Sequence, residues 1–270
     1  MTAPATLPAL LRRNHGSGHV YYLDGERAPG VTAILRQTPK PGLIDHAGKV
    51  TANYAIDHWD ELSLLPISER LDALNRARSI ELQAAARRGT TVHRLAAALA
   101  AGEQVGVPEE LAGHVDAYLD FLHRVDPMVV AIELVVASRS HRYCGTADLV
   151  ADLGALLLDD GEQLDACRWL LDIKTSRGLY AESALQTCAY SRADVWLDQS
   201  GRLRLMRDLG IKRCGVVHVR ADGWDLRPVD AGDVTWDYFL HLRWLYARDE
   251  VSKSWIGAAI EPPALAGALT

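Results

Sequence analysis

Two stretches, GTADLVADL at residues 145–153 and WLLDIKT at residues 169–175, decide the fold of this chain. Both are apolar runs of the kind that favours β-strands, and they carry the acidic residues Asp148 and Asp172. Because strand side chains alternate between two faces, Asp172 and Lys174 share one face while their neighbours point into a core. A carboxylate and an ammonium on a buried face are costly unless they have a use. A divalent cation held by Asp148 and Asp172, with Lys174 beside a phosphate, would use all three.

The lysine is informative because lysine is rare in this chain. Of the 29 Lys and Arg residues only five are lysines, namely Lys40, Lys49, Lys174, Lys212 and Lys253. Arginine therefore supplies most of the positive charge, and a lysine inside a strand points to a specific purpose. Lysine is a compact charge with an adjustable pKa, which arginine is not. The alternative is an ion pair between Lys174 and an aspartate that only holds the sheet together, and the tripeptide Asp172 to Lys174 leaves both interpretations open.

The composition fits one large domain. The 270 residues are 49% hydrophobic, which is enough for a sizeable core. The N-terminus lacks the pattern of a signal peptide, and no run of about 18 apolar residues indicates a membrane span. We therefore expect a cytoplasmic protein, in a bacterial cell or a phage-infected host, with no membrane partner. The net charge of −6 weighs against a nucleic-acid partner, but a local basic groove can coexist with an acidic remainder.

The four cysteines do not indicate a metal cluster. Cys144, Cys167, Cys188 and Cys214 are widely spaced, so a zinc site of the CxxC type is not supported. Without a secretion signal, reduced thiols are the expected state.

Three further segments accompany the two acidic strands: RGTTVH at 88–93, AIELVV at 131–136 and ALQTCAY at 184–190. Taken in chain order, the five segments resemble the motifs of the PD-(D/E)XK nuclease superfamily, and most closely its RecB-type exonuclease branch. A sixth segment, HVYYLDGERAPGVTAIL at 19–35, is similar to the lead-in of phage members. No single segment is specific, but five in the same order are.

The resemblance implies an α/β fold, with a PD-(D/E)XK (restriction-endonuclease-like) core of a small mixed β-sheet flanked by helices and a largely helical N-terminal part. It also implies a metal-dependent deoxyribonuclease, specifically a DNA exonuclease of phage, recombination or repair metabolism, that uses Mg²⁺ or Mn²⁺ to hydrolyse phosphodiester bonds. Some relatives carry an iron–sulfur cluster on a clustered C-terminal set of cysteines. That set is missing here, so we expect no iron–sulfur cluster.

The same resemblance assigns metal ligands. They are His93, Glu133, Asp148, Asp172 and the backbone carbonyl of Ile173. Carboxylate and carbonyl oxygens suit Mg²⁺ and Mn²⁺, and imidazole can join a Mn²⁺ site. His93 could instead simply pack or cap a helix, and Glu133 could be an edge-strand acid that faces solvent.

Catalytic and DNA-binding roles complete the expected site. Lys174 would orient or deprotonate the attacking water beside Asp148 and Asp172. Gln186 and Tyr190 lie four residues apart on one helix face, where Gln186 could orient Lys174 or bind phosphate and Tyr190 could stack on or bond to DNA. The expected DNA contacts are Arg88, Arg142, Thr175, Ser176 and Arg177. The alternative for Gln186 and Tyr190 is an ordinary amphipathic helix.

The chain divides by its patterns into a loose N-terminus at 1–18, a single nuclease domain at 19–250 and a tail at 251–270. The domain comprises a mainly helical lead-in at 19–128 and a catalytic α/β core at 129–250. The lead-in should hold a hairpin turning at Asp24, then helices that include one capped by Ser68, one from about Thr90 to Gly102 and one opened by Pro108. In the core we expect strands at 129–138, 143–153 and 169–175, a helix at 181–198, a hairpin at 214–229 and a helix at 233–248.

Two other functions remain open from the sequence. The chain could be a DNA-end-binding recombination scaffold with this fold and little activity, or an endonuclease or junction-specific nuclease of the same fold. The expected partner is DNA, either linear duplex or single-stranded ends. A second copy of the chain or a recombination protein could join it. Exonuclease polarity, strand preference and the number of metal ions do not follow from the sequence.

Overall fold

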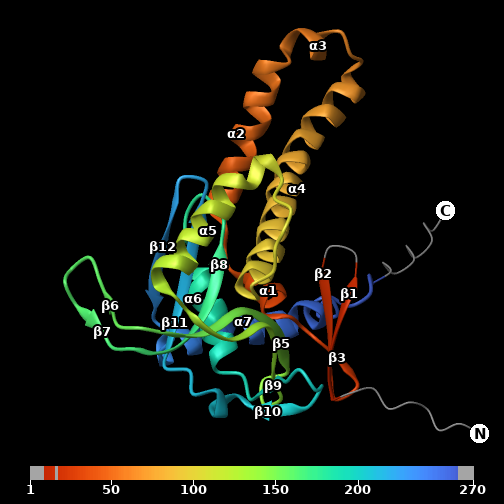
Figure 1. Cartoon of the computed structure of the whole chain (residues 1–270). Helices are drawn as coiled ribbons and strands as arrows, with labels where there is room; N and C mark the ends of the chain where they lie inside the picture. Colours follow the sequence, from red (N-terminus) through yellow and green to blue (C-terminus); the bar gives the residue numbers. More distant parts are fainter. Residues whose placement is uncertain (1–8, 16–17, 261–270) are drawn as a thin grey trace, which may run out of the picture.

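A computed structural model describes residues 9–15 and 18–260 of the chain. Its centre is a seven-stranded mixed sheet with the strand order β10-β9-β4-β5-β8-β11-β12 (Figure 1). Only β8 and β11 run parallel, and the other neighbours are antiparallel. The strands are β4 Met128–Ser138, β5 Tyr143–Leu153, β8 Cys167–Lys174, β9 Val195–Leu197, β10 Leu203–Leu205, β11 Arg213–Arg220 and β12 Gly223–Val229. The expected α/β class is confirmed.

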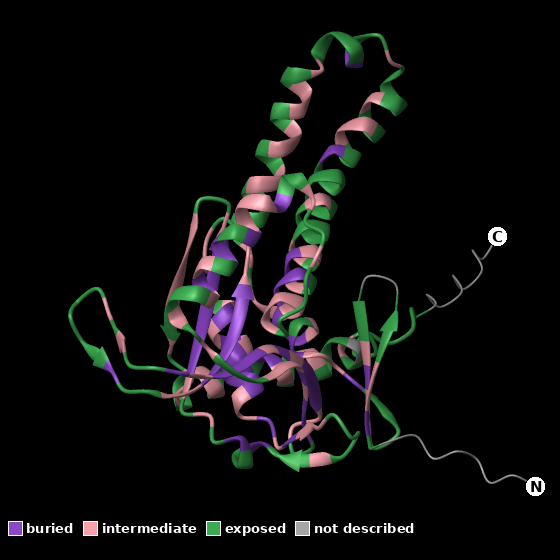
Figure 2. Cartoon of the chain, viewed as in Figure 1, coloured by how far each residue is buried: buried purple, intermediate pink, exposed green. Residues whose placement is uncertain are grey.

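Helices cover both faces of this sheet. On one face, α6 (Ala181–Ser191) and α7 (Asp233–Ser252) share a core with the short helix α1 (Val31–Ile34). On the other face, a second core is built by α5 (Ala112–Val125) and by the last turns of α4 (Ile67–Ala100). The short helix η2 (Glu109–Leu111) precedes α5. Figure 2 shows the buried residues concentrated in these layers.

The alternation expected for β8 is confirmed. Leu170 belongs to the core beneath α6, whereas Leu171 and Ile173 belong to the opposite core. Asp172 and Lys174 therefore lie on the α6 face of the sheet, one step along from Leu170. The strands expected at 129–138, 143–153 and 169–175 and the hairpin expected at 214–229 are also confirmed, with boundaries that move by no more than two residues.

The helical lead-in forms a long antiparallel hairpin that projects from one end of the sheet (Figure 1). After α1 and η1 (Leu35–Gln37), α2 (Pro41–Asp57) rises, α3 (Trp59–Ser63) turns, and α4 returns to the sheet. The expected helix break near Thr90 is wrong, because α4 continues without interruption from Ile67 to Ala100. The expected Ser68 cap is also wrong, since Pro66 occupies the N-cap position without a side-chain cap. Tertiary packing of the last turns overrides the local cost of Gly89.

A separate three-stranded sheet lies beside β5. It consists of β1 (Leu10–His15), β2 (Gly18–Leu23) and β3 (Glu26–Ala28), in that order. The expected loose N-terminus at 1–18 is therefore wrong for residues 10–15, which pair in register with β2. Pairing satisfies their backbone groups, and Leu10 is fully buried. The rest of that segment, 1–8 and 16–17, lies outside the described residues.

The end of the expected helix at 181–198 is wrong as well. Helix α6 ends at Ser191, and residues 195–197 form β9, which pairs with β4. Valine, tryptophan and leucine at these positions favour a strand once a sheet edge is available. The short helix η3 (Met206–Leu209) then leads to β11, while β6 (Leu156–Leu157) and β7 (Gln163–Leu164) form an arm at the side of the sheet (Figure 1). Helix α7 runs to Ser252, into the expected tail, of which residues 261–270 lie outside the described part.

None of the helices in the described residues is both long enough and apolar enough to cross a membrane.

Candidate active site

Asp172 and Lys174 meet at the end of β8. The Asp172 side chain is fully buried, and the Lys174 ammonium lies 2.5 Å from its Oδ2 atom. Apart from this contact with the Lys174 ammonium, the carboxylate oxygens of Asp172 have no hydrogen-bond partner in the described residues. Burial and the charge of Asp148 raise the pKa of Asp172 to about 6, although Lys174 opposes the shift. Asp172 is thus a buried acid with unused acceptor capacity.

Asp148 has two partners that Asp172 lacks. Its Oδ2 accepts a hydrogen bond of 2.7 Å from the backbone N–H of Ile173, and its Oδ1 lies 3.3 Å from Nδ1 of His93. Burial alone would raise the pKa of Asp148, but His93, Lys174 and the Ile173 amide together lower it. Burial alone would lower the pKa of His93, but the Asp148 carboxylate raises it. Asp148 is therefore the acid held in its ionised form.

The backbone explains how Asp148, on a central strand, reaches α4. In β5, Ala147 packs in the core beneath α6 and Leu149 in the opposite core, so the alternation of faces reverses at Asp148. The neighbouring strand reverses at the same level, where Glu133 has a φ of 50°. A left-handed backbone costs a non-glycine residue about 1–3 kcal/mol and is concentrated at functional sites. The reversal brings Asp148 between the β8 backbone and His93.

Glu133 sits opposite Asp148 in the ladder but turns its side chain elsewhere. The pairs Ile132 with Leu149 and Leu134 with Ala147 fix this register. The Glu133 carboxylate is 39% exposed and forms a 2.8 Å ion pair with Arg12 of β1. In this conformation, no three His, Cys, Asp or Glu residues of the described chain converge as a ligand set. The expected joint convergence of Glu133 with His93, Asp148 and Asp172 is therefore not what the structure has, because the N-terminal sheet supplies Glu133 with another partner.

Helix α6 fixes the far side of Lys174. The Lys174 ammonium donates a 3.1 Å hydrogen bond to Oε1 of Gln186, and the Gln186 amide donates a 3.0 Å bond to the Tyr190 hydroxyl. The Tyr190 ring is only 3% exposed and packs on Gly145, where a Cβ would lie 2.3 Å from the ring. Stacking of Tyr190 on DNA is therefore wrong for this arrangement, since the ring is enclosed. Gln186 was expected either to orient Lys174 or to bind phosphate, and in the structure it contacts Lys174.

The residues expected to bind DNA fall into two places. Thr175, Ser176 and Arg177 follow Lys174 directly, and Ser176 and Arg177 are exposed. Arg88 lies on α4 beside Gly89, and Gly89 faces the Thr175 hydroxyl. Arg142 is elsewhere, because it precedes β5 and lies six residues, about 20 Å of strand, from Asp148. Its guanidinium is paired with Glu26, so Arg142 does not belong to this site.

Three residues near the site are not among those that the sequence singled out. Arg12 pairs with Glu133 and donates a 3.3 Å hydrogen bond to Thr146. The buried Tyr118 hydroxyl of α5 has no hydrogen-bond partner in the described residues, and burial and then Asp148 raise its pKa. His218 of β11 lies next to Lys174 in the sheet. The first two are ordinary members of a strand and of a helix face in the sequence, and only the histidine in an apolar strand could have drawn attention.

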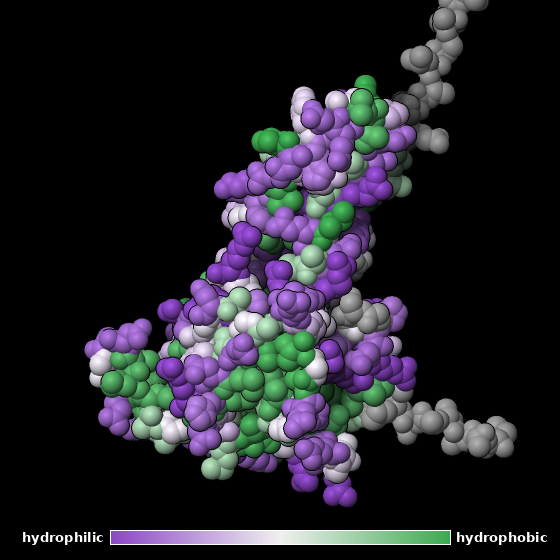
Figure 3. Space-filling model, turned by 45° about the horizontal axis from the view of Figure 1, so that its top comes forward, coloured by the Kyte–Doolittle hydropathy of each residue, from purple (hydrophilic) through white to green (hydrophobic). Residues whose placement is uncertain are grey.

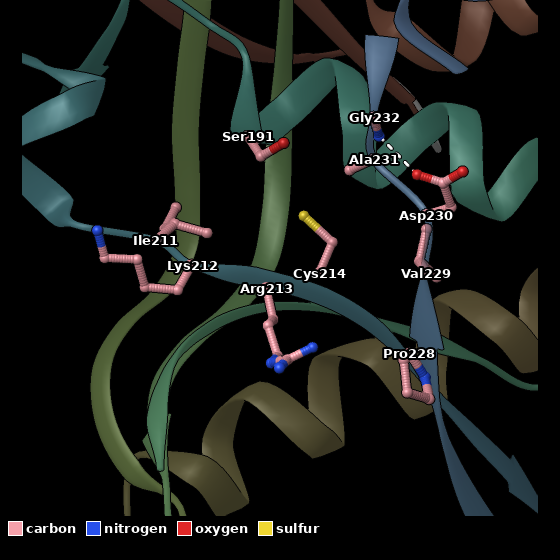
Figure 4. Close-up of a pocket in the computed structure, with 10 residues that line it drawn as sticks. All are labelled: Ser191, Ile211, Lys212, Arg213, Cys214, Pro228, Val229, Asp230, Ala231 and Gly232. Carbon is pink, nitrogen blue, oxygen red and sulfur yellow. Dashed lines mark hydrogen bonds between the residues drawn. The ribbon is translucent and has the colours of Figure 1, made fainter. Parts of the chain in front are cut away.

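Two cavities lie away from these residues. One, of about 350 Å³, is at the opposite end of β11 and is lined by residues that include Lys212, Arg213 and Cys214. Figure 4 shows the Lys212 and Arg213 side chains pointing in different directions, so their charges do not converge on a common anion. The other, of about 540 Å³, lies between the β6–β7 arm and β12. Neither is lined by Asp148, Asp172 or Lys174.

No known family profile matches the sequence, and no curated protein matches it.

Proposed function

We propose that this protein is a metal-dependent nuclease with a PD-(D/E)XK core, and that it hydrolyses phosphodiester bonds at DNA ends as a RecB-like exonuclease. The observation that carries the proposal is Asp172. Its carboxylate is fully buried, and the Lys174 ammonium, 2.5 Å from Oδ2, is the only polar partner that it has in the described residues. A structural ion pair would satisfy the remaining acceptor sites, because an unsatisfied buried polar group costs about 1–3 kcal/mol.

The residues present fit a hard divalent cation. Asp172 offers a buried carboxylate whose polar partner in the described residues is the Lys174 ammonium, and Asp148 and the Ile173 carbonyl are the further ligands we propose for Mg²⁺ or Mn²⁺. His93 would join through the imidazole that now faces Asp148, and Glu133 would join only after leaving Arg12. When bound, such an ion polarises the phosphoryl group and acidifies a water molecule.

The chain's own groups would do the rest. Lys174 is held between Asp172 and Gln186, and the negative charge of Asp172 and Asp148 raises its pKa against the effect of burial. It therefore stays protonated and can offset the charge that develops on the phosphate. Tyr190 holds Gln186, so the ammonium has a fixed position. Arg88, Thr175, Ser176 and Arg177 would contact the DNA backbone at the rim.

An end-labelled assay tests this function. We expect the wild-type protein to release labelled nucleotides from linear duplex DNA in Mg²⁺ or Mn²⁺ and to release none in EDTA. Asp172→Asn should abolish the release, whereas Asp165→Asn, an exposed acid that precedes β8, should leave it unchanged. Intact linear DNA with both ions would refute the proposal. Cleavage of covalently closed circular DNA would identify the endonuclease alternative instead.

A further inference from the structure

His218 occupies an unusual place for a polar residue. It lies in β11 beside Lys174 of the parallel strand β8, between the fully buried Val217 and Val219, and it is only 6% exposed. A valine at this position would pack without cost, whereas a buried imidazole must have its nitrogens satisfied. Both nitrogens of His218 have partners, and those partners lead to the loop that follows Lys174.

The two partners define the tautomer of the ring. The Nε2 atom lies 2.7 Å from the backbone carbonyl of Ser176, and a carbonyl can only accept, so Nε2 carries the hydrogen. The Nδ1 atom lies 3.0 Å from Nη1 of Arg220, and a guanidinium can only donate, so Nδ1 presents its lone pair. Asp225 is farther from Nδ1, at 3.7 Å, and it engages Arg220 at 2.5 Å. The hairpin β11–β12 thus holds the ring as a neutral Nε2–H tautomer.

The held carbonyl belongs to the loop at 175–178. Ser176 is two residues beyond Lys174, and its hydroxyl donates a 2.7 Å hydrogen bond to the carbonyl of Gly178. His218 therefore anchors a turn that begins directly after Lys174 and carries Ser176 and Arg177 at the surface. A backbone that shifts by about 1 Å at such a place can cost about 100-fold in rate.

We propose that His218 is a positioning residue for the nuclease reaction. Through the Ser176 carbonyl it fixes the loop at 175–178, and so sets where the Lys174 ammonium and the phosphate-contacting groups of that loop stand. Arg220 and Asp225 keep the imidazole in the tautomer that can donate to the carbonyl. This inference rests on the proposed function for its catalytic part, but the anchoring of the loop is a property of the chain alone.

Two substitutions at one position test the proposal. His218→Leu removes both hydrogen bonds, and His218→Gln keeps an amide donor for Ser176 and a carbonyl acceptor for Arg220. We expect His218→Leu to lower kcat on linear DNA by roughly 10- to 100-fold without changing the Mn²⁺ dissociation constant. His218→Gln should recover most of that loss. A control, His241→Leu, removes an exposed helix histidine whose Nδ1 lies 2.6 Å from the Asp237 carbonyl one turn earlier in the same helix, and it should leave kcat unchanged.

Hydrogen exchange measures the anchoring without any need for activity. In metal-free protein, amides at 175–178 should exchange at least about fivefold faster in His218→Leu than in wild type, with other regions unchanged. His218→Gln should restore slow exchange. The proposal is overturned if the Leu variant is folded and matches wild type in both loop exchange and kcat, or if Gln and Leu are equally impaired in both. If the wild type itself cleaves no DNA, the proposed function fails, while the exchange result still decides whether His218 anchors the loop.

Discussion

The strands that carry Asp148 and Asp172 differ from the projecting helical hairpin in how completely their residues are buried. Five successive residues of β8, Trp169 to Ile173, are buried, whereas α2 has no buried residue among its 17. Figure 3 shows apolar and polar side chains mixed along the surface of the projecting hairpin. In the sheet every polar group needs a partner, so the position of Asp172 or Lys174 carries information about chemistry. In the hairpin, water satisfies the polar groups. The position of an acid or a lysine there therefore says little about chemistry.

Replacing Lys174 is the strongest test of this comparison. We expect Lys174→Ala and Lys174→Arg each to lower nuclease activity by about 1000-fold, because the charge beside the reacting phosphate is lost or misplaced. Lys212→Ala, an exposed lysine at the other end of the neighbouring strand, should have no effect. Initial rates on linear DNA and a thermal melt of each variant are the measurements. A large fall in Tm, with activity retained by the folded fraction, would make Lys174 an ion-pair partner only.

Replacing one apolar side chain by alanine in the sheet and one in the hairpin compares burial in the two regions directly. Leu170→Ala in the sheet should lower the free energy of unfolding by about 2–5 kcal/mol, because the residue is fully buried. Ile80→Ala in the hairpin should change it by no more than about 0.5 kcal/mol, since the side chain is 61% exposed. Urea denaturation of the metal-free proteins measures both values. Equal losses would show that the hairpin is covered in solution.

Metal binding should stabilise the sheet end. At a Mn²⁺ concentration about 100 times the dissociation constant, we expect the wild-type protein to gain about 2.7 kcal/mol. The gain should disappear in Asp172→Asn and persist in Asp165→Asn, because the carboxylate of Asp172 is buried beside Lys174 whereas Asp165 is exposed. Melting curves with and without EDTA provide the test. A Tm that Mn²⁺ leaves unchanged in the wild type would contradict the assignment of the acids as ligands.

A glycine pair gives the smallest expected effect. Gly145→Ala should cost about 1–3 kcal/mol of stability, because the added Cβ would lie 2.3 Å from the Tyr190 ring and displace it. Gly154→Ala, at the other end of β5, should have little effect, since nothing lies within 4 Å of a Cβ there. Denaturation and near-ultraviolet circular dichroism of both variants are the measurements. If both variants match the wild type, Tyr190 is not held against β5.

The elements that followed from the sequence are those with a clear local period. Strands β4, β5 and β8 alternate or run apolar, and the hairpin β11–β12 turns at polar residues, so their limits were predictable. The segments that were predicted wrongly lack such a local period, or their structure depends on residues that are distant in the sequence. Gly89 indicates a helix end locally, yet α4 continues through it to Ala100. Residues 195–197 form a strand that pairs with the edge of β4, a partner far away in the sequence.

The site residues also divide into those that could be predicted from the sequence and those whose contacts could not. Asp148, Asp172 and Lys174 could be named from the sequence, because a buried strand makes charged residues conspicuous. The contacts of Gln186 and His93 depend on helices that the sequence places only roughly. The pairing of Glu133 with Arg12 joins residues 121 positions apart and was not predictable. The sequence left Tyr190 either to stack on or bond to DNA or to belong to an ordinary amphipathic helix, and the structure packs its ring on Gly145.

The sequence by itself determined which residues could do chemistry: two acids and a lysine on adjoining apolar strands, in an α/β chain. The tertiary structure decided which of them are free to do it. Asp172 has only the Lys174 ammonium as a polar partner in the described residues, whereas Asp148 accepts a hydrogen bond from Ile173 and faces His93, and Glu133 is paired with Arg12. The physical reason is that side-chain identity and strand period are local properties of the chain. The partner of a buried charge depends on which distant segments pack beside it.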